Sequence, residues 1–276
     1  MGFVSHWLLV APVLLFNLHA GTLSDFLDPT KFGDLDQHLV DACKDSIGNS
    51  LACGPAAAVN SFVFLENRYP SIYGNSLVDL SGLFTKTQAE VMAANDLSSF
   101  MGCTPCNGGT KFSDFVKGKE NYIDLLAPDT TSYRVMKIPS AEFIDGELSS
   151  DEDIETLINF PDPDFPGHYV TITGITYDTV LEMGYLSFID PADGKLHAAQ
   201  IYGGGATPGI FIDYLDPSTG LEHDGGELTG AISESPSVPE PTTISLLAAG
   251  VLFTSFCRRR KRISAISPRK KGPVTA

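Results

Sequence analysis

Basic residues are scarce in this sequence. Its 276 residues include 18 Lys and Arg but 34 Asp and Glu, a formal net charge of −16. Eight of the basic residues lie after residue 257, whereas Glu240 is the one acidic residue outside 21–237. The central span therefore carries 10 basic and 33 acidic residues, a net charge near −23. This charge argues against nucleic acid or an anionic surface as a partner, and it favours solubility.

Charged residues are absent from the first twenty positions. This segment contains a mostly apolar run, Trp7–Leu18, and ends in Leu-His-Ala. Although a basic start is also missing, the run and its small terminal residue resemble a secretory signal. We predict a signal peptide over residues 1–20, with cleavage after Ala20. The alternative is a buried first helix of the fold.

Cysteine is sparse: the five are Cys43, Cys53, Cys103, Cys106 and Cys257. A structural zinc site usually needs two CxxC pairs, and only Cys103–Cys106 is present. That pair also lacks the strand-then-helix setting of a thioredoxin site. Because an exported chain meets an oxidising compartment, we predict a loop disulfide between Cys103 and Cys106. Cys43 either pairs with Cys53 or stays free.

Recognisable cofactor motifs are also missing. Gly203–Gly205 does not match a phosphate-binding fingerprint and has no helix after it. The stretch Asp190–Gly194 lacks the ligand spacing of a calcium loop, so we interpret it as a turn. We therefore predict neither a metal nor a cofactor.

The C-terminus contains three consecutive segments. Ser237–Thr243 is rich in proline, Ile244–Phe256 is apolar, and Arg258–Arg262 is basic. The apolar stretch is short for a bilayer crossing, which usually takes about 20 residues. Basic residues stay on the cytoplasmic side of a membrane, so the chain before Pro239 is expected to face outward.

This arrangement resembles the PEP-CTERM sorting signal of bacterial surface proteins, with Pro239, Glu240 and Pro241 as the motif. The resemblance implies recognition and cleavage by an exosortase. Until that processing, the C-terminal segment is expected to hold the protein in the membrane. We assign residues 238–262 to the sorting signal and 263–276 to a basic cytoplasmic tail. The expected location is the cell surface or extracellular matrix; a plain membrane anchor is the alternative.

The span 21–237 has the length of one domain and changes character along its course. The first half predicts helices over Asp34–Lys44, Gly54–Arg68 and Thr87–Ser99. The second half alternates at period two, which predicts strands. The expected strands are His168–Gly174, Gly184–Asp190, His197–Tyr202 and Gly209–Tyr214. Together they predict an α+β fold, with a helical N-terminal half packed on an antiparallel β-sheet C-terminal half.

Cys53 stands where a helix is expected to begin. Unpaired N–H groups and the helix dipole favour an anion there, which lowers the pKa of a thiol. His168 begins a predicted strand and Asp190 ends the next one, and antiparallel neighbours can bring such positions together. The three residues then form a possible nucleophile, base and orienting group. Taken without His168 and Asp190, Cys53 is better explained as a buried small residue.

Three blocks in this order resemble papain-like cysteine peptidases of the bacteriocin-processing type: Cys53–Ala57, Gly167–Val170 and Ile189–Pro191. The resemblance implies a papain-like fold in which Cys53 is the nucleophile, His168 the general base and acid, and Asp190 the orienting residue. The family usually carries a Gln shortly before the cysteine as an oxyanion donor, and none occupies the six positions before Cys53. Gln37 and Asn49 are the candidates for that role.

The sequence thus predicts an exported cysteine peptidase acting on peptide or protein substrates by peptide-bond hydrolysis or related acyl transfer. The alternative is a catalytically inert papain-like surface or matrix binding protein. The missing nearby Gln and the strong acidity favour this alternative. A structural cell-surface component is a third possibility.

Overall fold

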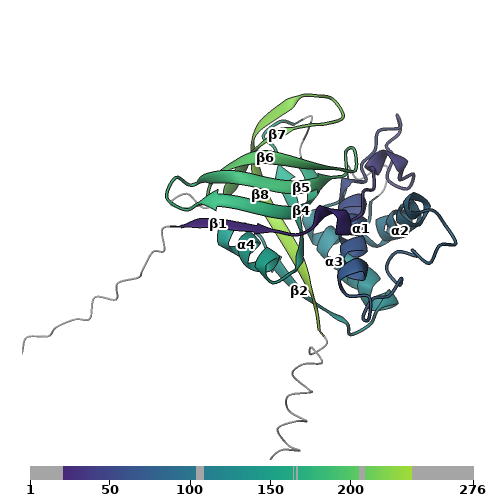
Figure 1. The fold of residues 1–276 in the computed structure, drawn as a ribbon. Helices are drawn as coiled ribbons and strands as arrows, with labels where there is room; N and C mark the ends of the chain where they lie inside the picture. Colours follow the sequence, from purple (N-terminus) through teal and green to yellow (C-terminus); the bar gives the residue numbers. More distant parts are fainter. Residues whose placement is uncertain (1–20, 104–108, 164, 166, 205–208, 238–276) are drawn as a thin grey trace, which may run out of the picture.

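The computed structural model describes residues 21–103, 109–163, 165, 167–204 and 209–237, in which eight strands form one antiparallel sheet (Figure 1). Six of the strands close into a barrel in the order β4-β3-β8-β7-β6-β5, because β5 pairs back with β4. The barrel strands are β3 (Asp153–Asn159), β4 (Gly167–Asp178), β5 (Met183–Asp190), β6 (Lys195–Gly203), β7 (Ile210–Leu215) and β8 (Glu222–Pro236).

Two further strands lie outside the barrel and pair with its two longest strands, β4 and β8. The first, β1 (Thr22–Phe26), pairs with the second half of β4, from Thr22 opposite Asp178 to Phe26 opposite Gly174. The second, β2 (Thr131–Met136), pairs with the end of β8. Because β4 and β8 are long, their ends can take these extra partners outside the closed ring.

Three helices pack together on one side of the barrel, and α1 (Cys53–Arg68) lies innermost, against β3 and β4 (Figure 1). Every residue of α1 from Gly54 to Glu66 is buried, which the small Ala56, Ala57 and Ala58 allow. The other two are α2 (Lys86–Phe100) and α3 (Phe112–Leu126). A fourth, α4 (Ala141–Ser149), packs on β1 and β4, and two short 3-10 turns are η1 (Pro29–Lys31) and η2 (Gln37–Leu39).

The predicted fold class is wrong. The expected papain-like arrangement placed a helical first half on a sheet made by the second half, whereas the strands close into a barrel. The sheet also takes β1, β2, β3 and β8 from segments for which no strand was expected. Two of these strands lack the apolar alternation that would have revealed them. Buried acidic residues interrupt it on β3, and frequent Gly and polar residues interrupt it on β8.

Individual elements were predicted with mixed success. The helices expected over Gly54–Arg68 and Thr87–Ser99 are confirmed as α1 and α2. The helix expected over Asp34–Lys44 is wrong, because only η2 forms there. Tertiary hydrogen bonds hold this segment open: Leu35 N donates to the Asn60 side chain, and Gln37 N donates to Pro191 O.

A buried charged cluster joins the helices to the barrel. Lys119 of α3 lies among Asp153 and Glu155 of β3 and Glu234 of β8, and all four side chains are fully buried. We call this set the Lys119 cluster. Its carboxylates lie close enough together to hold a metal ion, but the Lys119 ammonium already bonds Glu155 and Glu234. Burial would lower the pKa of Lys119, yet the three carboxylates raise it, so the ammonium stays charged.

Candidate active site

Cys53 is the first residue of α1 and carries a free, half-buried thiol. Pro55 lies in the first turn, where its missing N–H removes no helical hydrogen bond. No side chain caps this end of the helix, so its N–H groups are available to an anion. A Cβ at Gly54 would lie 3.3 Å from the side chains of Phe115 and Thr110, so the glycine lets α3 and the segment before it approach the helix start.

His168 and Asp190 come from adjacent barrel strands. His168 is the second residue of β4 and Asp190 the last of β5. The two strands pair as far as Thr171 opposite Ile189, which brings these positions to the same end of the sheet. His168 Nε2 lies 2.7 Å from Asp190 Oδ1, and both side chains are buried. This contact occupies Nε2 and leaves the other ring nitrogen, Nδ1, for a second partner.

The thiol and the imidazole are electrostatically coupled. Burial alone would raise the pKa of Cys53, but the hydrogen bond and positive charge of His168 hold it below its ordinary value, helped by the N–H groups of Tyr169 and Gly54. Burial alone would lower the pKa of His168, but Asp190 and, to a smaller extent, Cys53 raise it to about 10. Both shifts favour a thiolate beside an imidazolium over the neutral pair.

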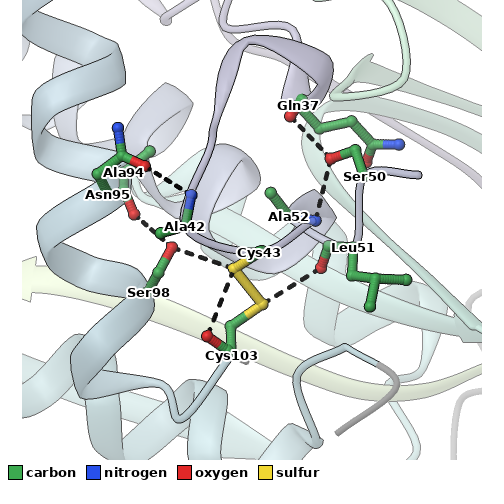
Figure 2. Close-up of a disulfide and its surroundings, with 10 residues drawn as sticks. All are labelled: Gln37, Ala42, Cys43, Ser50, Leu51, Ala52, Ala94, Asn95, Ser98 and Cys103. Atoms are coloured by element: carbon green, nitrogen blue, oxygen red, sulfur yellow. Dashed lines mark hydrogen bonds between the residues drawn. A yellow bond between two sulfur atoms is a disulfide. The ribbon is translucent and has the colours of Figure 1, made fainter. Parts of the chain in front are cut away.

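The turn after Asp190 packs on the segment that carries Gln37. Gly194 has a φ of +69°, and a Cβ there would lie 2.2 Å from Asp34 O, so only glycine fits this turn. Gln37 N donates to Pro191 O at 2.7 Å, and Ser50 Oγ donates to Gln37 O at 2.8 Å (Figure 2). The backbone of Gln37 is thus held between Pro191, which follows Asp190, and Ser50, which lies three residues before Cys53. The side-chain oxygen Oε1 of Gln37 is buried and has no hydrogen-bond partner among the described residues.

Asn49 lies in a different environment. Its side-chain amide donates to Asp45 Oδ2 at 3.0 Å, and its backbone N–H donates to Asp45 Oδ1 at 2.8 Å. These bonds are exposed and close a turn on the surface. The structure therefore commits the Asn49 amide to this turn, whereas the Gln37 backbone is bonded to Pro191, the residue after Asp190, and to Ser50.

The disulfide pairing predicted for Cys103 is wrong. Cys103 pairs with Cys43, with their Cα atoms 5.6 Å apart (Figure 2). Cys106 lies outside the described residues, as do residues 1–20 and the Pro239–Pro241 motif. The bridge ties the segment before α1 to the end of α2, a contact between residues 60 positions apart that spacing alone does not indicate. It also leaves the Cys53 thiol free.

The sequence argument missed Tyr214, the fifth residue of β7. Its hydroxyl donates to Asp190 Oδ2 at 2.7 Å. A signal was available, because Ile210, Ile212 and Tyr214 alternate onto one buried face of the predicted strand. A buried tyrosine usually finds a partner for its hydroxyl.

Residues 237–261 match the PEP-CTERM protein-sorting motif. The chain is therefore an exported protein, recognised by an exosortase, transiently anchored in the membrane and sorted to the cell surface. The match covers the C-terminal signal alone and leaves the folded domain unassigned. No curated protein sequence is significantly similar to this chain. Within the part of the chain that the structure describes, none of the helices is long and apolar enough to cross a membrane.

Proposed function

We propose that the folded domain is a cysteine peptidase whose catalytic triad is Cys53, His168 and Asp190. The observation that carries the proposal is a free thiol at a helix start whose pKa is lowered by an adjacent imidazole, and the Nε2 of that imidazole lies 2.7 Å from a buried carboxylate. Such constellations recur on unrelated folds, so the proposal depends on the site rather than on the architecture.

In the proposed reaction the Cys53 thiolate attacks the carbonyl carbon of a peptide bond and forms a C–S bond. His168 donates its proton to the leaving nitrogen as the C–N bond breaks, which leaves a thioester on the enzyme. A water molecule then gives a proton to His168 and attacks the thioester. The acid product leaves, and the thiolate–imidazolium pair is restored.

Gln37 is the proposed oxyanion donor, together with the backbone N–H of Cys53. The support is its place between Pro191 and Ser50, whereas the Asn49 amide is engaged by Asp45. Loss of one such donor typically lowers the rate by about 10²–10³. We expect Gln37→Ala to slow hydrolysis by that factor, and Asn49→Ala, its matched control, to leave the rate within about threefold.

The test is the pH dependence of iodoacetamide labelling on the Cys53 peptide of the full chain, followed by mass spectrometry. Labelling of wild type should stay fast at pH 6, and His168→Ala should return it to the profile of an ordinary thiol with a pKa of about 8.5. Wild type should also cleave casein or a peptide library, and Cys53→Ala should not. Hydrolysis that survives Cys53→Ala would refute the mechanism.

A catalytically inert surface binding protein is the second candidate. The observation that favours it is the 3% exposure of His168, which leaves little of the imidazole open to a substrate. The labelling experiment separates the two candidates, because an inert binding protein has no need of an activated thiol. Labelling that follows an ordinary thiol profile and is indifferent to His168→Ala would favour binding.

A further inference from the structure

The carboxylate of Asp190 accepts three hydrogen bonds. Oδ1 accepts from His168 Nε2 at 2.7 Å and from Ala192 N at 2.8 Å, while Oδ2 accepts from the Tyr214 hydroxyl at 2.7 Å. Asp190 is fully buried, so each oxygen depends on these donors. Among the described residues, Tyr214 is the one side chain that forms a hydrogen bond with Oδ2. Its removal would leave that oxygen buried without a partner.

The ring of Tyr214 is fixed by its aromatic neighbours. Its centroid lies 5.5 Å from Phe160, 6.4 Å from Phe188 and 5.4 Å from His168. Tyr214 itself is 2% exposed. A ring packed in this way has little rotational freedom, so its hydroxyl is held in the position from which it donates to Asp190 Oδ2.

The hydroxyl has one proton to donate, and the nearby acids do not compete for it. Burial raises the pKa of Tyr214, with Asp190, Asp216 and Cys53 adding to the effect, so the phenol stays neutral. Asp216 takes its own donors, because Oδ1 accepts from Ser218 and Oδ2 from Thr219, each at 2.7 Å. The Tyr214 proton is therefore committed to Asp190.

We infer that Tyr214 is a positioning residue of the candidate site. Its hydroxyl fixes the Asp190 carboxylate, and the carboxylate in turn holds the His168 ring that lowers the pKa of Cys53. The inference rests on the proposed function, because it assigns a role within the same site. It extends the triad to a four-residue chain that begins on α1 and ends on β7.

The experiment compares Tyr214→Phe with wild type in the full chain. Tyr73→Phe is the matched control, because Tyr73 is also fully buried and its hydroxyl bonds Thr131 of β2 at 2.8 Å instead of a residue of the candidate site. The first readout is the pH profile of iodoacetamide labelling at Cys53. Tyr214→Phe should slow labelling at pH 6 by roughly three- to tenfold and leave the rate at pH 9 unchanged, since a hydrogen bond to a charged group is lost. Tyr73→Phe should leave the whole profile unchanged.

The second readout is the ¹⁵N chemical shift of His168 as a function of pH, which reports the imidazole whether or not the thiol is reactive. Tyr214→Phe should lower the pH at which His168 loses its proton, and Tyr73→Phe should not. Incorporation of 3-fluorotyrosine at position 214 keeps the ring and makes the phenol a stronger donor. Its labelling profile and its His168 titration should therefore resemble those of wild type more closely than those of Tyr214→Phe do. This comparison with wild type provides a test even if the phenylalanine variant folds poorly.

The outcomes separate this inference from the proposed function. If wild-type labelling depends on His168 but neither readout changes in Tyr214→Phe, the positioning role is wrong and the peptidase proposal stands. If wild-type labelling is that of an ordinary thiol, the peptidase proposal fails. In that case a changed His168 titration in Tyr214→Phe still supports the positioning of His168 by Tyr214, and an unchanged titration overturns it.

Discussion

The molecule contains two buried charged groups of residues at the boundary between helices and barrel, and they differ in access to solvent. The Lys119 cluster connects α3 to β3 and β8, and all of its side chains are fully buried. The candidate triad of Cys53, His168 and Asp190 connects α1 to β4 and β5, and it ends in a half-buried thiol. Both place a cation against buried carboxylates.

The difference shows that a shifted pKa does not by itself mark a functional site. Burial raises the pKa of Glu155 to about 8 and that of Asp153 to about 7, although neither carboxylate is open to solvent. A candidate site also needs a reactive atom that another molecule can reach. Cys53, a free cysteine that is only partly buried, is the candidate for such an atom, whereas the Lys119 cluster contributes to the connection between α3 and the barrel.

The largest expected effect comes from neutralising the carboxylate of the candidate triad. Asp190→Asn should lower peptide hydrolysis by about 10³–10⁴, because the amide no longer stabilises the imidazolium. Asp193→Asn is the matched control, since Asp193 bonds His197 at 2.9 Å in the same turn. The comparison of rates checks this prediction, and equal losses in the two variants would contradict it.

Removal of the cation from the Lys119 cluster should affect stability instead of reactivity. Lys119→Met leaves three carboxyl groups buried without their partner, so we expect a loss of about 3–5 kcal/mol in the free energy of unfolding. Lys44→Met is the control, because Lys44 pairs with the exposed Asp41 and its loss should cost less than about 1 kcal/mol. Urea denaturation measures both. A changed Cys53 labelling profile in Lys119→Met would break the distinction between the two groups.

The Cys43–Cys103 disulfide should contribute somewhat less. Replacing both cysteines by alanine should lower the free energy of unfolding by about 2–4 kcal/mol, since the bridge closes a loop of 60 residues. Cys53→Ala leaves the bridge intact and serves as the control in the same urea titration. Alkylation of Cys103 in the unreduced protein would contradict the pairing.

The smallest effect is the pH dependence of stability that the Lys119 cluster produces. Burial raises the pKa of Glu155 to about 8 from an ordinary 4.5, so the folded state retains a proton that the unfolded state releases. The contribution is complete below pH 4.5 and is lost as the pH rises through 8, at about 1.4 kcal/mol for each pH unit, which is less than the losses expected for Lys119→Met and for removal of the disulfide. Glu155→Gln should flatten the curve of unfolding free energy between pH 5 and 8. A curve as steep as that of wild type would exclude Glu155 as its source.

Local patterns predicted the elements that follow simple periodicity. Small residues and Pro55 indicated α1, and alternation indicated the strands that became β4 to β7. The helices α3 and α4 and the strands β1, β2, β3 and β8 were not predicted. On β3 the buried Asp153 and Glu155 look like surface positions until Lys119, which lies 34 and 36 residues away in sequence, is placed against them.

The sequence alone determined the C-terminal sorting signal and the charge of the domain, and it proposed the three residues of the candidate triad. Short motifs and residue types carry that information, and no contact is needed to read it. Only the tertiary structure decided the closed barrel, the Cys43–Cys103 bridge and the place of Tyr214 beside Asp190. Each of these joins residues far apart in the chain, and such pairings are fixed by packing and hydrogen bonding of the whole fold rather than by any local pattern.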